Sequence, residues 1–80
     1  MPLKLVFLGR LESVAGEAER TVDTVTTLAE LLSGFAPALA GAVSGERVRV
    51  AVNGRLVNDR AAQHLRDGDE VAFLPPVSGG

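Results

Sequence analysis

The chain has 80 residues, of which 46% are hydrophobic, and a formal net charge of −2. This length predicts a single domain with one small core. The sequence contains no cysteine, which excludes disulfides, thiolate metal sites and a catalytic thiol. Its basic residues are scattered, whereas a nucleic-acid groove needs clustered lysine and arginine. Nucleic-acid binding is therefore not expected.

The apolar segments are short. The apolar runs at residues 5–9 and 36–43 are well below the roughly 20 residues of a membrane-spanning helix. The apolar run after Lys4 is also too short for a signal peptide, and Arg10 ends it. These features favour a cytoplasmic protein.

The first part of the chain predicts two strands. Residues 3–10 are rich in leucine, valine and phenylalanine and predict a strand. Residues 11–19 contain Ser13, Gly16 and several acidic residues and predict a loop. Residues 18–22 predict a short second strand, antiparallel to the first.

An amphipathic helix is expected next. Val25, Leu28, Leu32 and Phe35 recur at steps of three and four residues, which is the spacing of one helix face. Pro37 disfavours helical geometry at the residue before it, so the helix should end at Gly34 or within residues 35–37. A weaker helical turn is predicted for residues 38–44.

Two threonines compete as the N-cap of this helix. Thr27 with Glu30 matches the capping-box pattern. Thr24 precedes the first apolar position and keeps Val25 inside the helix. For that reason Thr24 is the preferred cap.

The second half of the chain predicts strands joined by tight turns. Residues 47–52 alternate arginine or alanine with valine, which is the pattern of a half-buried strand. Asn53-Gly54 is a strong hairpin signal because both residues tolerate positive φ. The remaining predictions are a return strand over residues 55–57, a helical turn within 58–65, a turn at 67–69 and a last strand over 70–74.

This order of elements predicts the α+β class. Residues 1–74 should form a mixed sheet of about five strands with one main helix on one face, and residues 75–80 an extended tail.

Side chains that could form an active site are few. His64 is the only histidine, and we interpret it as a surface residue. The acidic cluster of Asp67, Asp69 and Glu70 could attract a hard cation, but Asp-Gly-Asp is also ordinary turn chemistry. Arg47 and Arg49 share one strand face, where solvent or a polar partner would meet them. No metal site is predicted.

The tail is the most distinctive segment. Pro75 and Pro76 stiffen its base, and Gly79 and Gly80 end it without side chains. Six extended residues reach about 20 Å. The Gly80 carboxylate is therefore a reactive group on a thin arm. A frayed end or a remnant of a fusion is the alternative interpretation.

The sequence resembles a known family on several motifs. Residues 65–80 read LRDGDEVAFLPPVSGG, residues 51–54 read AVNG and residues 7–12 read FLGRLE. These resemble the closing signature, the central strand and turn, and the first strand and loop of the small, sulfur-carrying subunits of molybdopterin synthase. Those subunits are ubiquitin-like β-grasp sulfur carriers. Gly9 departs from the family, where alanine is usual, and so does Ser13-Val14.

The resemblance implies a mechanism. An activating enzyme of the ubiquitin-E1 type would use ATP to adenylate the Gly80 carboxylate. A sulfur donor would convert the adenylate to a thiocarboxylate. The large synthase subunit would then accept the tail and transfer the sulfur to a pterin precursor, while Gly79 gives access to a narrow channel. The chain itself would bind no cofactor and have no active site of its own.

The resemblance also implies a partner interface on the open sheet face. One helix covers only one face, so Leu8 and Leu74, with Leu56 near them, should be exposed. Pro75, Pro76 and Val77 would extend this interface along the tail. Residues 38–44 or a neighbouring loop could instead cover these side chains.

Several different functions are compatible with the sequence alone. A carrier for thiamine, cysteine or tRNA thiolation would keep the Gly-Gly tail and change only the receiving enzyme. The Pro75-Pro76 pair favours the molybdopterin branch, since the thiamine-type carriers generally lack it. A protein modifier conjugated through Gly80 and an interaction module with an inert tail belong to different functional classes and stay open as well.

Overall fold

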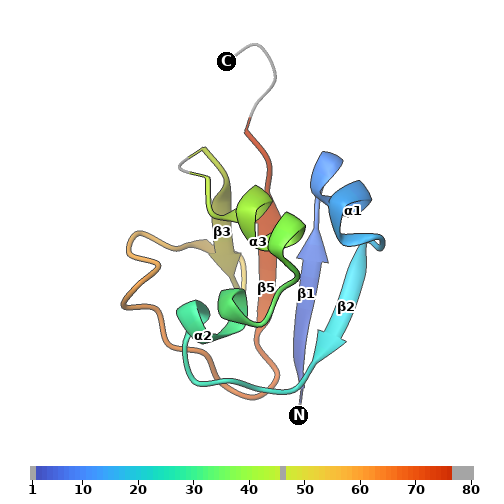
Figure 1. Cartoon of the computed structure of the whole chain (residues 1–80). Helices are drawn as coiled ribbons and strands as arrows, with labels where there is room; N and C mark the ends of the chain where they lie inside the picture. The colour runs from blue at the N-terminus through green and yellow to red at the C-terminus, as the bar shows by residue number, and fades with distance from the viewer. Residues whose placement is uncertain (1, 46, 77–80) are drawn as a thin grey trace.

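The structure, a computed structural model, describes residues 2–45 and 47–76. It contains five strands and three short helices (Figure 1). The strands are β1 (Leu3–Phe7), β2 (Glu19–Val22), β3 (Arg49–Val52), β4 (Arg55–Leu56) and β5 (Glu70–Leu74). The helices are α1 (Arg10–Ala15), α2 (Leu28–Ser33) and α3 (Pro37–Val43).

The strands form one mixed sheet in the order β2-β1-β5-β3-β4. The two strands nearest the chain ends, β1 and β5, run parallel at its centre, and the other neighbours are antiparallel. Helices α2 and α3 lie in front of one face of the sheet in Figure 1. This two-layer arrangement confirms the predicted α+β class and the five strands.

The core is organised around aromatic side chains from the two central strands. Phe7 and Phe73 are almost fully buried, and their rings stack with centroids 5.3 Å apart. Phe35, just after α2, packs against both rings at 6.2 and 5.8 Å. Such aromatic pairs contribute about 0.5–1.5 kcal/mol each beyond the burial of apolar area. The helical layer is thereby fixed to the centre of the sheet.

The first strand is shorter than the predicted range of 3–10. It ends at Phe7, because Gly9 adopts φ 55° and ψ −135° and α1 begins at Arg10. The last strand, in contrast, spans the predicted residues 70–74.

The loop predicted over residues 11–19 is wrong in its first part, which belongs to α1. Leu11 is buried and Ala15 packs against the core, so one turn and a half of helix covers this end of the sheet. Gly16 ends the helix at φ 85°, and its N–H donates to the carbonyl of Glu12 at 2.8 Å. The segment has only two core-facing residues, four positions apart, which is too weak a periodicity to indicate a helix.

The preferred cap, Thr24, is also wrong. Thr27 is the N-cap of α2, and its Oγ1 accepts a hydrogen bond from the Glu30 N–H at 3.2 Å. The residues before it pair with a distant segment instead of joining the helix. The carbonyl of Thr26 accepts from the Leu65 N–H at 2.8 Å, and Thr27 forms a β-bridge with His64. These long-range bonds keep the residues before Thr27 out of the helix.

The helical layer consists of two short helices where one main helix was expected. Within α2 the buried residues are Leu28 and Leu31, while Leu32 is half-buried. Pro37 occupies the first turn of α3, whose buried residues are Leu39 and Val43. The predicted turn over 38–44 is therefore confirmed as a helix that starts one residue earlier.

The remaining turns follow local chemistry. Asn53 and Gly54 have φ 51° and 84° and join β3 to β4, as the hairpin signal predicted. Residues 58–65 form turns and no helix, and Asp59 Oδ1 accepts from the N–H groups of Ala61 and Ala62.

Within the described residues, every helix falls short of the length and apolar character that a membrane span requires.

Candidate functional site

The base of the tail is firmly held by the sheet. β5 pairs with β1 on one side and with β3 on the other, where the pairing reaches Leu74. Beyond the pairing with β1, the Leu8 N–H donates to the Phe73 carbonyl at 3.1 Å. Pro75 and Pro76 follow and are half-buried. The predicted site residues Val77, Gly79 and Gly80 lie outside the described residues.

Gly9 lies directly against the first proline of the tail. A Cβ placed on Gly9 would lie 2.8 Å from Pro75 Cγ, closer than real side chains approach. The positive φ of Gly9 is a second reason for glycine at this position. The departure from the family's usual alanine therefore has a structural cause in this chain. The contact fixes where the chain leaves the sheet.

The open face of the sheet carries a group of neighbouring apolar side chains. Strand register places Val6, Ala72, Ala51 and Leu56 in one row across four strands. Leu8 and Leu74 lie one step nearer the tail on the same face. We call these six residues the open-face patch.

Exposure within the patch confirms the prediction for two of its three leucines. Leu8 is 41% exposed and Leu56 58% exposed, whereas Leu74 is half-buried and not exposed as predicted, and Ala51 is buried. Their neighbours on the other parity, Phe7 and Phe73, are in the core. The helix spanning 37–43 lies on the opposite face, so it does not cover the patch.

Charged side chains border the patch on several sides: Glu19 is the β2 neighbour of Val6, Lys4 and Glu70 lie one step farther from the tail, and Arg49 pairs with Leu74. Lys4 Nζ lies 3.5 Å from Glu19 Oε1 and 3.7 Å from Glu70 Oε2. These three side chains lie on the same face, on strands β2, β1 and β5. Exposed pairs of this kind contribute little stability, about 0–1 kcal/mol each. Their effect here is to delimit the apolar surface.

The acidic cluster at residues 67–70 has structural contacts. Asp69 accepts hydrogen bonds from the Asn53 side chain at 2.9 Å and from the Arg66 N–H at 2.9 Å. A hydrogen bond from the Thr24 hydroxyl lowers the pKa of the Asp67 carboxyl below its ordinary value. No group of three potential metal-ligating side chains is found among the residues that the structure describes. His64 is exposed, as expected.

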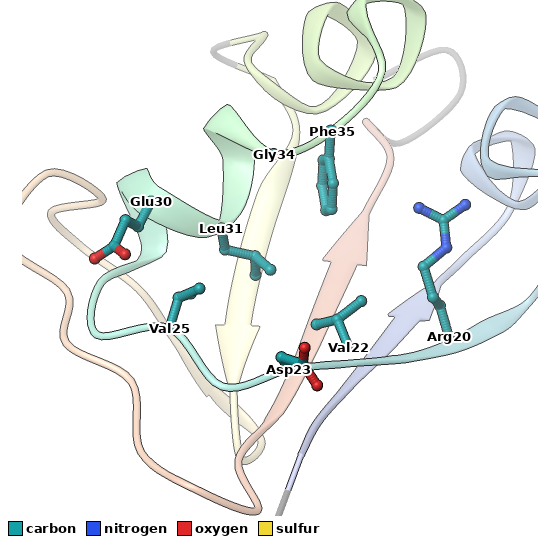
Figure 2. A pocket seen from close by; sticks show the side chains of 8 residues that line it. All are labelled: Arg20, Val22, Asp23, Val25, Glu30, Leu31, Gly34 and Phe35. Atoms are coloured by element: carbon teal, nitrogen blue, oxygen red, sulfur yellow. The ribbon is translucent and has the colours of Figure 1, made fainter.

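A small hollow lies at the opposite edge of the core, between β2 and α2 (Figure 2). Its volume is about 190 Å³, and Val22, Leu31 and Phe35 supply apolar side chains to it. The guanidinium of Arg20 lies 5.4 Å from the centroid of the Phe7 ring. It donates hydrogen bonds to the Glu17 carboxylate and to the Ala15 carbonyl. Arg20 thus closes the edge of the core that α2 leaves uncovered, and neither tail proline lines the hollow.

Sequence reasoning locates the exposed leucines but misses the Gly9 contact. In the sequence, Gly9 stands out only as a departure from a family pattern. A glycine directly after an apolar strand indicates a tight turn with positive φ. This signal does not reveal which residue packs against the glycine.

Comparisons with known proteins agree over the whole length of the chain. Residues 5–80 match the ThiS family. A protein of Chlamydomonas reinhardtii named molybdopterin synthase sulfur carrier subunit is 33% identical over 86 residues, covering 100% of both chains. The Escherichia coli (strain K12) protein of the same name is 33% identical over 82 residues, covering 98% of this chain and 99% of that protein.

A solved structure shows the same fold with comparable identity. The crystal structure of SAMP1, small archaeal modifier protein 1, from Haloferax volcanii superposes with a TM-score of 0.79 at 31% identity. The superposition covers 100% of both chains.

The Gly9–Pro75 contact can be measured by a double-mutant cycle. Gly9→Ala should lower the free energy of unfolding by about 1–3 kcal/mol, because of the positive φ and the approach to Pro75. In a Pro75→Ala background this loss should shrink, since Cγ is gone. Urea unfolding of the four proteins gives the coupling.

Gly16→Ala is the matched control for backbone strain. Gly16 also has a positive φ, but a Cβ placed there would meet no atom within 4 Å. Its cost should be the same in the parent chain and in the Pro75→Ala background. An equal cost of Gly9→Ala in both backgrounds would show that the contact with Pro75 is unimportant.

Proposed function

The chain belongs to the ThiS family, and we propose that it is a sulfur carrier, the small subunit of a molybdopterin synthase. In this proposal the Gly80 carboxylate is adenylated, converted to a thiocarboxylate and presented to a large subunit. The chain supplies the tail and the docking surface, and the catalytic groups belong to its partners.

The observation that carries the proposal is the extent of the matches. The family match runs to residue 80 and so includes Gly79 and Gly80. The two curated relatives named as molybdopterin synthase sulfur carrier subunits match over nearly their full lengths. The position of Pro75 and Pro76 after the doubly paired β5 supports the same conclusion, because the tail begins at a fixed point.

The chemistry of the terminus explains why activation must come from outside. An α-carboxyl group has a pKa of about 3.3–3.7 and is ionised at neutral pH, which makes it a poor electrophile. An E1-like adenylyltransferase would let this carboxylate attack the α-phosphorus of ATP, forming an acyl-adenylate and releasing pyrophosphate. ATP is thus bound by the activating enzyme and not by the carrier.

The sulfur step then follows by acyl substitution. A sulfur donor enzyme supplies a nucleophilic sulfur that attacks the Gly80 carbonyl carbon, and AMP leaves. With a persulfide as the donor, reductive cleavage of its S–S bond by a thiol leaves the thiocarboxylate. After the sulfur has passed to the pterin precursor, water restores the carboxylate. The absence of cysteine from the chain fits this route, since no side-chain thiol competes for the sulfur.

The open-face patch is the surface that we assign to the large subunit. It combines exposed Leu8 and Leu56 with half-buried Leu74 on one side of the sheet. Pro75 and Pro76 follow Leu74 in the chain, and we assign them and Val77, which lies outside the described residues, to the same interface. Exposed apolar surface of this kind is typical of protein–protein interfaces.

A second candidate function is protein modification. The observation that favours it is the likeness to SAMP1, whose name describes a modifier. The same adenylated Gly80 would then form an amide with a lysine amine of another protein, with AMP as the leaving group. Carriers for thiamine, cysteine or tRNA thiolation differ from our proposal only in the acceptor.

The tail provides the first test. Deleting Gly79 and Gly80 should abolish ATP–pyrophosphate exchange with the activating enzyme, because the reacting carboxylate is displaced by two residues. Gly80→Val should have nearly the same effect, because its side chain obstructs a narrow channel. The melting temperature should not change, since the core residues lie within residues 3–73. Full exchange activity of the truncated chain would refute the assignment of Gly80.

The open-face patch provides the second test. Leu8→Asp should weaken binding to the large subunit at least about tenfold, because the new carboxylate would be buried without a partner. Its stability should change little, since Leu8 is 41% exposed. Titration calorimetry and urea unfolding measure the two effects separately.

Phe73→Ala is the control for this variant. Phe73 is fully buried, so its loss should cost about 3–5 kcal/mol of stability. If Leu8→Asp instead unfolds the domain and leaves the affinity of any folded protein unchanged, the patch is not an interface.

A further inference from the structure

A groove opens beside the tail base on the helix side of the sheet, away from the open-face patch. Its volume is about 350 Å³, and it lies between α1, α3, the segment leading into β3 and the two prolines. Leu11 and Val48 are buried and form its floor. Val14 lines it as well and is 42% exposed. We call this site the tail-base groove.

Two arginines stand at the edges of the groove. Arg10 begins α1 and Arg47 precedes β3, and both are exposed. Neither side chain has a hydrogen bond or ion pair with another residue in the described ranges 2–45 and 47–76. Within residues 2–45 and 47–76, the residues lining the groove include no carboxylate. This described part of the groove is therefore apolar at its floor and positive at its edges, although the whole chain is acidic.

The third arginine of this region has a structural role, which sets the other two apart. Arg60 donates to the carbonyls of Val43, Gly45 and Val48 and so links the end of α3 to the residue that precedes β3. This fixes the wall that carries Arg47 and Val48. The groove is thus a preformed surface, which lowers the entropic cost of binding.

The groove and the open-face patch meet at the tail. Pro75 and Pro76 line the groove, and Leu74 and Leu8 of the patch adjoin Pro75 and Gly9 in the chain. A partner that encloses the tail base therefore touches both surfaces. Charge complementarity then determines the chemistry expected of that partner, because two guanidinium groups without a partner among the described residues attract carboxylates.

We propose that the tail-base groove is a second docking site for the protein that receives the tail, and that its occupant is a segment with an aliphatic or aromatic side chain next to Asp or Glu. The apolar side chain lies over Leu11, Val14 and Val48, and the carboxylate pairs with Arg10 and Arg47. The inference rests on the proposed function, with the large subunit as the receiving protein. It adds a charge-dependent contact on the face that the sheet interface does not reach.

The test compares two double variants that remove the same charge. Arg10→Gln/Arg47→Gln removes the groove pair, and Arg55→Gln/Arg66→Gln removes two exposed arginines that do not line the groove. Binding of the large subunit is measured by calorimetry at low and high salt. The groove variant should bind about 5- to 20-fold more weakly at low salt, and the difference should shrink at high salt. The control variant should stay within about twofold of the parent chain.

A third variant tests the apolar part and guards against misfolding. Val14→Glu would place a carboxylate beside the arginines and occupy the partner's position, so it should weaken binding with both arginines present. Equal losses in the two double variants, or unchanged binding in the groove variants, would overturn the inference.

The proposed function has a separate readout. With saturating large subunit, the groove variants should still transfer sulfur from Gly80, whereas the Gly79-Gly80 deletion should not. If the groove variants bind the large subunit as tightly as the parent chain and still transfer sulfur, only the groove inference is refuted. Transfer by the deletion variant would refute the carrier function. Binding of free ATP to the isolated chain that disappears in Arg10→Gln/Arg47→Gln would assign the groove to a nucleotide and also overturn the inference.

Discussion

The stacking of Phe73 on Phe7 at the centre of the sheet is the contact on which the rest of the structure depends. It joins the first and last strands, which run parallel and side by side. Phe35 from the helical layer packs against the same pair of rings. Deleting such a buried phenylalanine removes several kcal/mol, a large part of the stability of a small domain. The tail therefore starts two residues after a fully buried point of the core.

This placement anchors the last described residues of the chain to the core. Backbone hydrogen bonds to β1 and β3 hold β5 on both sides. The contact between Gly9 and Pro75 then sets the direction in which the chain leaves the sheet. Since the two sheet faces differ, with helices on one and the open-face patch on the other, the same exit point presents two chemically different surfaces.

Local signals in the sequence predict much of this arrangement. The strand over residues 70–74, the Asn53-Gly54 turn and the apolar residues of 3–7 are local patterns, and the structure confirms each of them. The exposure of Leu8 and Leu56 follows from how much of a sheet one helical layer can cover.

The errors arise where distant segments decide the conformation. The local pattern favours Thr24 as the cap because it contains no sign that Thr26 and Thr27 pair with residues 64–65. Helix α1 is stabilised by packing of Leu11 and not by its own periodicity. The tail-base groove joins residues from three separate stretches of the chain, so no motif could have revealed it.

The central claim is that the end of this chain carries sulfur. Intact-mass spectrometry of the chain, incubated with its activating enzyme, ATP and a sulfide source, tests it most directly. We expect a mass change equal to replacement of one oxygen by sulfur, dependent on ATP and located by fragmentation at Gly80. An unchanged mass, with or without ATP, would contradict it, and so would ATP-dependent amide adducts between Gly80 and lysines of other proteins without any sulfur incorporation.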